Sequence, residues 1–263
     1  MNAFRSFLHS FLEWKVILTT LSIDVVSTAL ITALFWGYGS ILGAKAYALS
    51  GGQSVEQLKN SLLTGTLENS QIFLAKIKLF TILFIGGAIA IIIITVLVYS
   101  LSRAILWYHL MDLSFQHYWK WNGMAILLGF MLLPYTLLVF LFRYLVNSLI
   151  PIRSQLLFSI VDGISISIFI YLFLILTFAI TLSFVEKYRV WEAIGHGFYL
   201  LKKNRSKLWK TFLFALLIGL LINIKVSLLQ TQIPSPLIFA IVRIGLFLLF
   251  LSWLRIYFVK TIV

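Results

Sequence analysis

The segment from Leu79 to Leu101 reads LFTILFIGGAIAIIIITVLVYSL and contains no charged side chain in 23 residues. A helix needs about 20 apolar residues to cross the hydrocarbon core of a bilayer, so this segment is long enough to span one. Its apolar residues are continuous and do not alternate with polar ones, which excludes a strand of a membrane β-barrel. The segment therefore predicts a transmembrane helix.

Five further segments have the same character. In chain order the six predicted spans are approximately 16–42, 79–101, 124–147, 159–185, 209–230 and 237–258. The first is longer than the apolar part of a signal peptide, about 7–15 residues, so we expect it to be an uncleaved span. Lys225 and Arg243 interrupt the last two, which leaves open whether these segments cross fully or form a shallow hairpin. The predicted fold class is all-α, a polytopic helical membrane protein that forms one domain over residues 1–263.

The composition agrees with this fold class. Hydrophobic residues make up 61% of the chain and charged residues 11%, whereas soluble domains have about 45–50% and about 25%. The net charge of +13 would favour nucleic-acid binding in a soluble protein, but no soluble basic face with interleaved aromatic residues is available, so no nucleic-acid partner is expected. The chain has no cysteine, which excludes disulfides, zinc–thiolate sites and thiol catalysis.

The distribution of basic residues predicts the orientation. Seven of the twenty-one Lys and Arg residues lie between Glu186 and Lys210, and we call this stretch the basic segment. With the N-terminal end of the chain inside, the cytoplasmic loops carry thirteen basic residues and the opposite loops eight. The excess depends on the basic segment alone. By the positive-inside bias, both ends of the chain are predicted to be cytoplasmic, in a multi-pass protein of the cell's plasma (cytoplasmic) membrane.

The basic segment also has helical periodicity. Apolar residues recur at helical spacing across Lys187–Lys203, which predicts a short amphipathic helix that lies in the membrane interface and ends near Asn204. A second interfacial helix is predicted in the outer loop, where Ser54 and Gln57 form a capping-box pattern. The basic side chains either contact anionic lipid headgroups, at about 1 kcal/mol each, or serve only to hold the topology. The candidate headgroup contacts are Lys187, Arg189, Lys202, Lys203, Arg205, Lys207 and Lys210.

One family resemblance rests on the same stretch. Glu186, the run Trp191-Glu192-Ala193-Ile194 and the run FYLLKKN at 198–204 together resemble a recurring segment of one membrane-protein superfamily. It contains the YciC-like proteins and the membrane domain associated with some glycerophosphoryl diester phosphodiesterases. The chain departs from that pattern at Gly197, where the family usually has Ser. The resemblance implies a polytopic helical domain with no known catalytic residues of its own, because the phosphodiesterase activity belongs to a separate soluble domain.

A Trp-Lys pair recurs three times along the chain. The pairs Trp14-Lys15, Trp119-Lys120 and Trp209-Lys210 each stand at the predicted cytoplasmic start of an odd-numbered span, after an aromatic-rich stretch. Two interpretations remain open. Trp and Lys are both favoured at the inner interface, or the chain consists of three helical hairpins that each begin with an interfacial helix.

Two groups of polar residues are candidates for an intramembrane site. Asp24 lies in the first span, where a carboxylate is costly and therefore suggests a function unless local hydroxyls or a neighbouring Lys or Arg satisfy it. On the outer side, Asp162 and several cations could converge on a phosphate or carboxylate, or each cation could reach a headgroup separately. The members of this outer group are Arg143, Asn147, Asp162, Lys225 and Arg243.

No catalytic, cofactor-binding or metal-ligating residue is predicted. All four histidines fall on the predicted cytoplasmic side, and His109, Asp112 and His117 lie within nine residues without a zinc-protease spacing. The leading expectation is a non-catalytic scaffold or helper that binds anionic phospholipid, or a partner protein, through the basic segment. The alternatives are a small-solute or ion transporter that uses Asp24 or the outer group, and a lipid-modifying enzyme around His109, Asp112 and His196.

Overall fold

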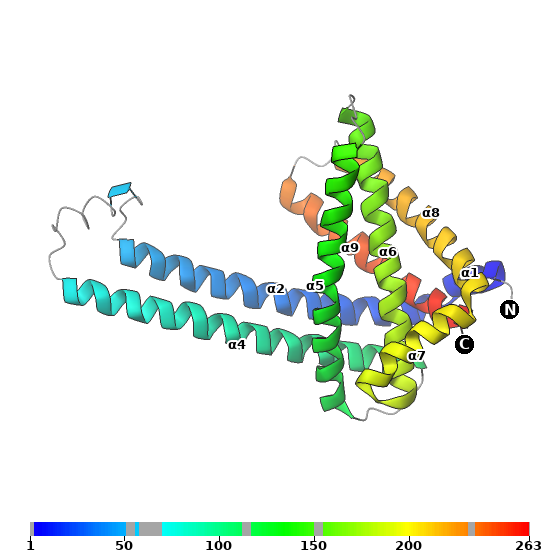
Figure 1. The fold of residues 1–263 in the computed structure, drawn as a ribbon, viewed down its shortest axis with the longest axis horizontal. Coiled ribbons are helices and arrows are strands. Elements are labelled where there is room, and N and C mark those ends of the chain that lie inside the picture. The colour runs from blue at the N-terminus through cyan, green and yellow to red at the C-terminus, as the bar shows by residue number, and fades with distance from the viewer. Residues whose placement is uncertain are drawn as a thin grey trace. The chain divides into compact units, whose positions relative to one another are not determined.

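The computed structural model describes residues 3–50, 56–57, 70–111, 117–149, 155–230 and 235–262, and almost all of them are helical. Eight helices are present in this part of the chain, and Figure 1 shows their order. They are α1 (Ala3–Leu12), α2 (Trp14–Ser50), α4 (Ser70–Met111), α5 (Tyr118–Leu149), α6 (Gln155–Lys187), α7 (Val190–Lys203), α8 (Arg205–Gln230) and α9 (Pro236–Ile262).

Six of these helices, α2, α4, α5, α6, α8 and α9, are long and apolar enough to cross a membrane. Each of the six predicted spans falls inside one of them, so the prediction of an all-α membrane protein with six spans is confirmed. The helices continue beyond the apolar segments. The 42 residues of α4 extend about 63 Å, which is roughly twice the thickness of a hydrocarbon core. A helix can continue beyond the membrane in this way because its backbone hydrogen bonds are formed within the helix itself.

Two local features of the sequence concern the proline in α5 and the loop between α2 and α4. Pro134 lies inside α5 without ending it. The interfacial helix predicted in the outer loop lies outside the described residues, except for the exposed Glu56 and Gln57.

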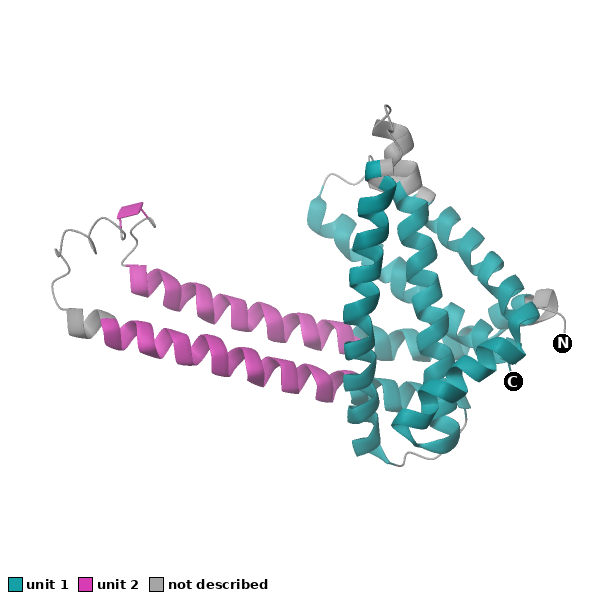
Figure 2. Ribbon diagram, in the orientation of Figure 1, with its two compact units in different colours: residues 1–25, 100–263 teal, residues 26–99 magenta. Residues whose placement is uncertain are grey.

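The chain divides into two compact units, which Figure 2 shows in different colours. The smaller unit, residues 26–99, contains the C-terminal part of α2 and most of α4. The Tyr38 hydroxyl donates a hydrogen bond to the Phe84 carbonyl at 2.6 Å. Gly87 makes room for this ring, since a Cβ there would lie 2.5 Å from Tyr38 Cε2. Gly87 thus permits close helix packing, as its position in an apolar span suggests.

The larger unit, residues 1–25 and 100–263, contains the main core. The C-terminal part of α6 lies at its centre, where all the residues from Phe178 to Val185 are buried. Trp107 of α4, Trp121 of α5 and Tyr257 of α9 are also almost fully buried in this core. Large buried aromatic side chains such as these dominate the packing energy of a core.

The short helix α1 packs against α9 and α8 within the larger unit. The ring of Phe7 contacts the rings of Phe214, Trp253 and Tyr257, at centroid distances of 5.1, 5.9 and 5.7 Å. The indole nitrogen of Trp253 donates a hydrogen bond to the Ser10 hydroxyl at 2.9 Å. Through these contacts α1, the aromatic-rich stretch before the first span, is held against the core.

Candidate functional site

The basic segment joins α6, α7 and α8 within the larger unit. It runs from the last two residues of α6 to the second turn of α8, and all seven of its basic side chains are exposed. Arg189 forms an ion pair with Glu192, with 2.6 Å between Nη1 and Oε1. No other ion pair involves these seven cations within the described ranges. Six exposed cations are therefore available to anions outside the protein.

Helix α7 holds the basic segment against α6. The residues that α7 buries are Ala193 and Gly197, the small ones. At Gly197 a Cβ would lie 2.9 Å from the Cα of Ile180 on α6, so the two backbones approach too closely for any side chain. The larger apolar residues lie less deep than the periodicity suggests, since Trp191 and Phe198 are 78% and 52% exposed.

The exposed aromatic residues lie among the exposed cations. Trp191, Phe198, Tyr199 and Trp209 are each more than half exposed. Trp and Tyr are enriched where a membrane meets water, because their rings are apolar and their N–H or O–H groups are polar. The surface thus combines the two residue types that occur at membrane interfaces.

The positions of the cations relative to the helix ends differ. Lys202 and Lys203 lie in the last turn of α7, where positive charge is favoured by the helix dipole. Arg205 and Lys207 lie in the first turn of α8, which contains no acidic residue. Positive charge at that end opposes the dipole by about 0.3–1 kcal/mol, so helix stability does not account for these two residues.

Asp24 lies in a buried charge cluster formed by three helices. Its side chain is 1% exposed, and its Oδ1 forms an ion pair with Arg103 of α4. Its Oδ2 lies 3.1 Å from Nη1 of Arg255 on α9 and accepts a hydrogen bond from Ser252 at 3.4 Å. Arg103 and Arg255, which are counted among the basic residues of the predicted cytoplasmic side, each lie inside a helix and not in a loop. A buried carboxylate requires such partners.

The outer group of polar residues is brought together only in part. Arg143 and Asp162 form a two-pronged ion pair between α5 and α6, with N–O distances of 2.7 and 2.8 Å. Lys225 and Arg243 are exposed and form no ion pair with the described residues. The side chain of Asn147 lies outside the described residues. Asp162 is thus paired with one cation of the group, Arg143.

The histidines give no arrangement typical of catalysis. His196 Nδ1 lies 3.2 Å from the Ser183 hydroxyl and 3.9 Å from Oε2 of Glu186. A hydrolytic base would use one ring nitrogen for the serine and the other for the acid, whereas here Nδ1 faces both. Ser183 is also fully buried and donates to the Ala179 carbonyl at 2.9 Å. His109 is exposed, and Asp112 lies outside the described residues.

The remaining histidines lie apart from this one. His9 is exposed, and the ring of His117 stacks on Tyr188 at a centroid distance of 4.8 Å. Over the described part of the chain, no three His, Asp or Glu side chains are grouped closely enough to hold a metal ion.

Comparison with known proteins adds no relative, because no family model, curated protein or solved structure matches the chain.

Proposed function

We propose that the protein is a non-catalytic multi-pass membrane protein that gathers anionic phospholipid at the cytoplasmic face of the membrane through the basic segment. The observation that carries this proposal is the exposure of all seven cations, of which only Arg189 has a carboxylate partner among the described residues. Each basic residue near an anionic surface contributes about 1 kcal/mol of attraction, so several neighbouring cations hold anionic headgroups together. A scaffold of this kind would concentrate such lipids, or a partner protein that carries acidic groups, beside its helices.

The proposal includes the orientation and the family. We place both ends of the chain and the basic segment on the cytoplasmic side, as the positive-inside bias favours. We also propose membership of the YciC-like superfamily on the residues between Glu186 and Asn204. The pairing of Asp24 with Arg103 and Arg255 supports a scaffold rather than a transporter, since both carboxylate oxygens are held by cations inside the core.

The proposal is tested by the lipid selectivity of the reconstituted protein. Nitroxide-labelled phosphatidylglycerol and phosphatidylcholine are compared by electron paramagnetic resonance in phosphatidylcholine vesicles. We expect the wild-type protein to prefer the anionic lipid, and this preference to weaken as salt is added because the contacts are screened.

Two matched triple variants locate the preference. The variant K202Q/K203Q/K207Q removes three exposed cations from the basic segment. The variant K45Q/K76Q/K78Q removes three exposed cations near the C-terminal end of α2 and the N-terminal end of α4. We expect the first to lose most of the preference, several-fold, and the second to keep most of it. Equal losses in both variants, or no preference in the wild type, would contradict the proposal.

A further inference from the structure

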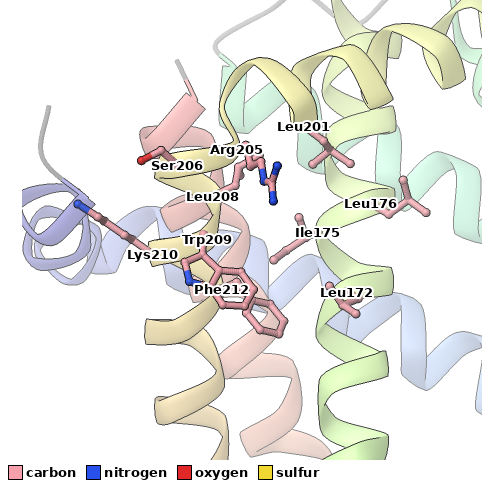
Figure 3. Close-up of a pocket in the computed structure, with 10 residues that line it drawn as sticks. All are labelled: Leu172, Ile175, Leu176, Leu201, Arg205, Ser206, Leu208, Trp209, Lys210 and Phe212. Carbon is pink, nitrogen blue, oxygen red and sulfur yellow. The ribbon is translucent and has the colours of Figure 1, made fainter.

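A cavity of about 710 Å³ lies beside the basic segment. It is bounded by α6, by the end of α7 and by the first two turns of α8, and all the residues that line it belong to the larger unit. Its volume lies within the range of about 300–1,000 Å³ that is typical of small-molecule sites. Figure 3 shows the side chains that line it.

The wall of the cavity is apolar on both sides. Leu172 and Ile175 of α6 face the rings of Trp209 and Phe212 of α8 (Figure 3), and Leu176 of α6 also lines the cavity. These two rings stack at a centroid distance of 5.6 Å and an interplanar angle of 21°. An apolar wall of this kind has no hydrogen-bonding requirement and suits a hydrocarbon chain.

One end of the cavity is cationic. The guanidinium group of Arg205 extends toward α6 over the cavity, whereas the ammonium group of Lys210 points the other way (Figure 3). No Asp or Glu is among the residues that line the cavity. Arg205 is also the first residue of α8, so the positive end of that helix dipole lies at the same end. A phosphate group is the ligand that a guanidinium and a helix N-terminus both favour.

We propose that this cavity is a discrete site for one anionic glycerophospholipid, with an acyl chain between α6 and α8 and the phosphate at Arg205. The inference rests on the proposed function, which it sharpens from a general attraction of anionic lipid to one defined site. It explains why Arg205 occupies a helix start where its charge opposes the dipole, since a bound phosphate is attracted by both positive groups and offsets their repulsion. Charge complementarity at one end and an apolar wall along the rest select a charged lipid over a zwitterionic one.

The site is tested by native mass spectrometry of the whole protein in detergent, titrated with dioleoyl phosphatidylglycerol. We expect one lipid to bind more tightly than any further ones. Arg205→Gln should weaken this first binding event at least about fivefold, the equivalent of one lost cation–headgroup contact. Lys120→Gln is the matched control, because Lys120 is an exposed cation in the first turn of α5 that lies outside the basic segment and does not line the cavity. It should leave the first binding event unchanged.

Two further arms separate the acyl chain from the headgroup. Leu172 is 46% exposed, so Leu172→Trp is compatible with folding. The larger side chain should fill the cavity and weaken phosphatidylglycerol binding as strongly as Arg205→Gln does. Inorganic phosphate and glycerophosphoglycerol, which have no acyl chain, should not compete with the lipid. Equal effects of Arg205→Gln and Lys120→Gln, unchanged binding in Leu172→Trp, or competition by the water-soluble phosphates would each overturn the site. The proposed function would still stand in those cases if the resonance experiment shows the anionic preference.

Discussion

At the residue scale, Tyr188 has a backbone conformation that is unusual for its type. Its φ of 52° lies in the left-handed region, directly after the end of α6. This conformation costs a residue with a Cβ about 1–2 kcal/mol, which glycine would avoid. The side chain compensates by stacking on His117 and by contacting Tyr108 and Phe184. Packing across the connection therefore outweighs the local backbone preference.

Glycine and alanine at this position separate the two effects. Tyr188→Ala loses the stacking and keeps the strained backbone, whereas Tyr188→Gly loses the stacking and relieves the strain. We expect the glycine variant to be more stable than the alanine variant by about 1 kcal/mol. Denaturant unfolding in detergent measures the difference, and an alanine variant as stable as the glycine variant would show that the conformation carries no strain.

The hydroxyl of Tyr188 gives a pH dependence of stability. Burial and the hydrogen bond with Tyr108 raise the pKa of Tyr188 to about 12, from its ordinary value of 10.0. The folded protein therefore holds this proton more tightly than the unfolded chain. The resulting stabilisation is fully present below pH 10.0 and is lost as the pH rises toward about 12. The free energy of unfolding of Tyr188→Phe should lack this decrease, and an identical pH profile in both proteins would refute the assignment.

The buried charge cluster gives the largest expected loss of stability from one residue. Asp24→Leu leaves Arg103 and Arg255 in the core without their carboxylate, and we expect it to cost about 3–5 kcal/mol. Adding Arg255→Met, which removes one of the two stranded charges, should recover part of that loss. The free energies of unfolding of the two variants decide this. A double variant no more stable than Asp24→Leu would mean that the cluster does not act through charge compensation.

At the element scale, the close approach of α7 and α6 at Gly197 is the contact that positions the basic segment. The backbone of Ile180 cannot move aside as a flexible side chain would, so Gly197→Ala should cost about 1–3 kcal/mol and loosen α7. Gly195→Ala is the control on the same helix, because a Cβ there meets open space. It should stabilise α7 by about 0.5–1 kcal/mol, the gain of alanine over glycine in a helix. Both effects are measured by the free energy of unfolding and by protease cleavage between α6 and α8. Equal values for Gly197→Ala and Gly195→Ala would contradict the close contact of α7 with α6 at Gly197.

The elements also show what could be predicted from the sequence. The spans were predictable because uninterrupted apolar runs have one solution in lipid, the helix. The buried face of α7 was not, because small residues such as Ala193 and Gly197 carry no hydropathy signal although they allow the closest packing. A Lys or Arg partner for Asp24 was one of the alternatives, but Arg103 and Arg255 could not be identified as the partners, since they stand near the ends of apolar runs and are distant from Asp24 in the chain. Only the three-dimensional arrangement pairs them.

At the scale of the whole molecule, we propose that the six spans hold the basic segment at the cytoplasmic face of the membrane. Because the chain has no cysteine, single introduced cysteines report on topology without background. Lys207 in the basic segment and Glu56 in the loop between α2 and α4 are both exposed, and the orientation that we propose puts them on opposite sides of the membrane.

The most direct measurement is therefore the labelling of Lys207→Cys and Glu56→Cys in intact cells with a maleimide that does not cross membranes. We expect Glu56→Cys to react at once and Lys207→Cys to react only after permeabilisation. Labelling of Lys207→Cys in intact cells, with Glu56→Cys protected until permeabilisation, would contradict it.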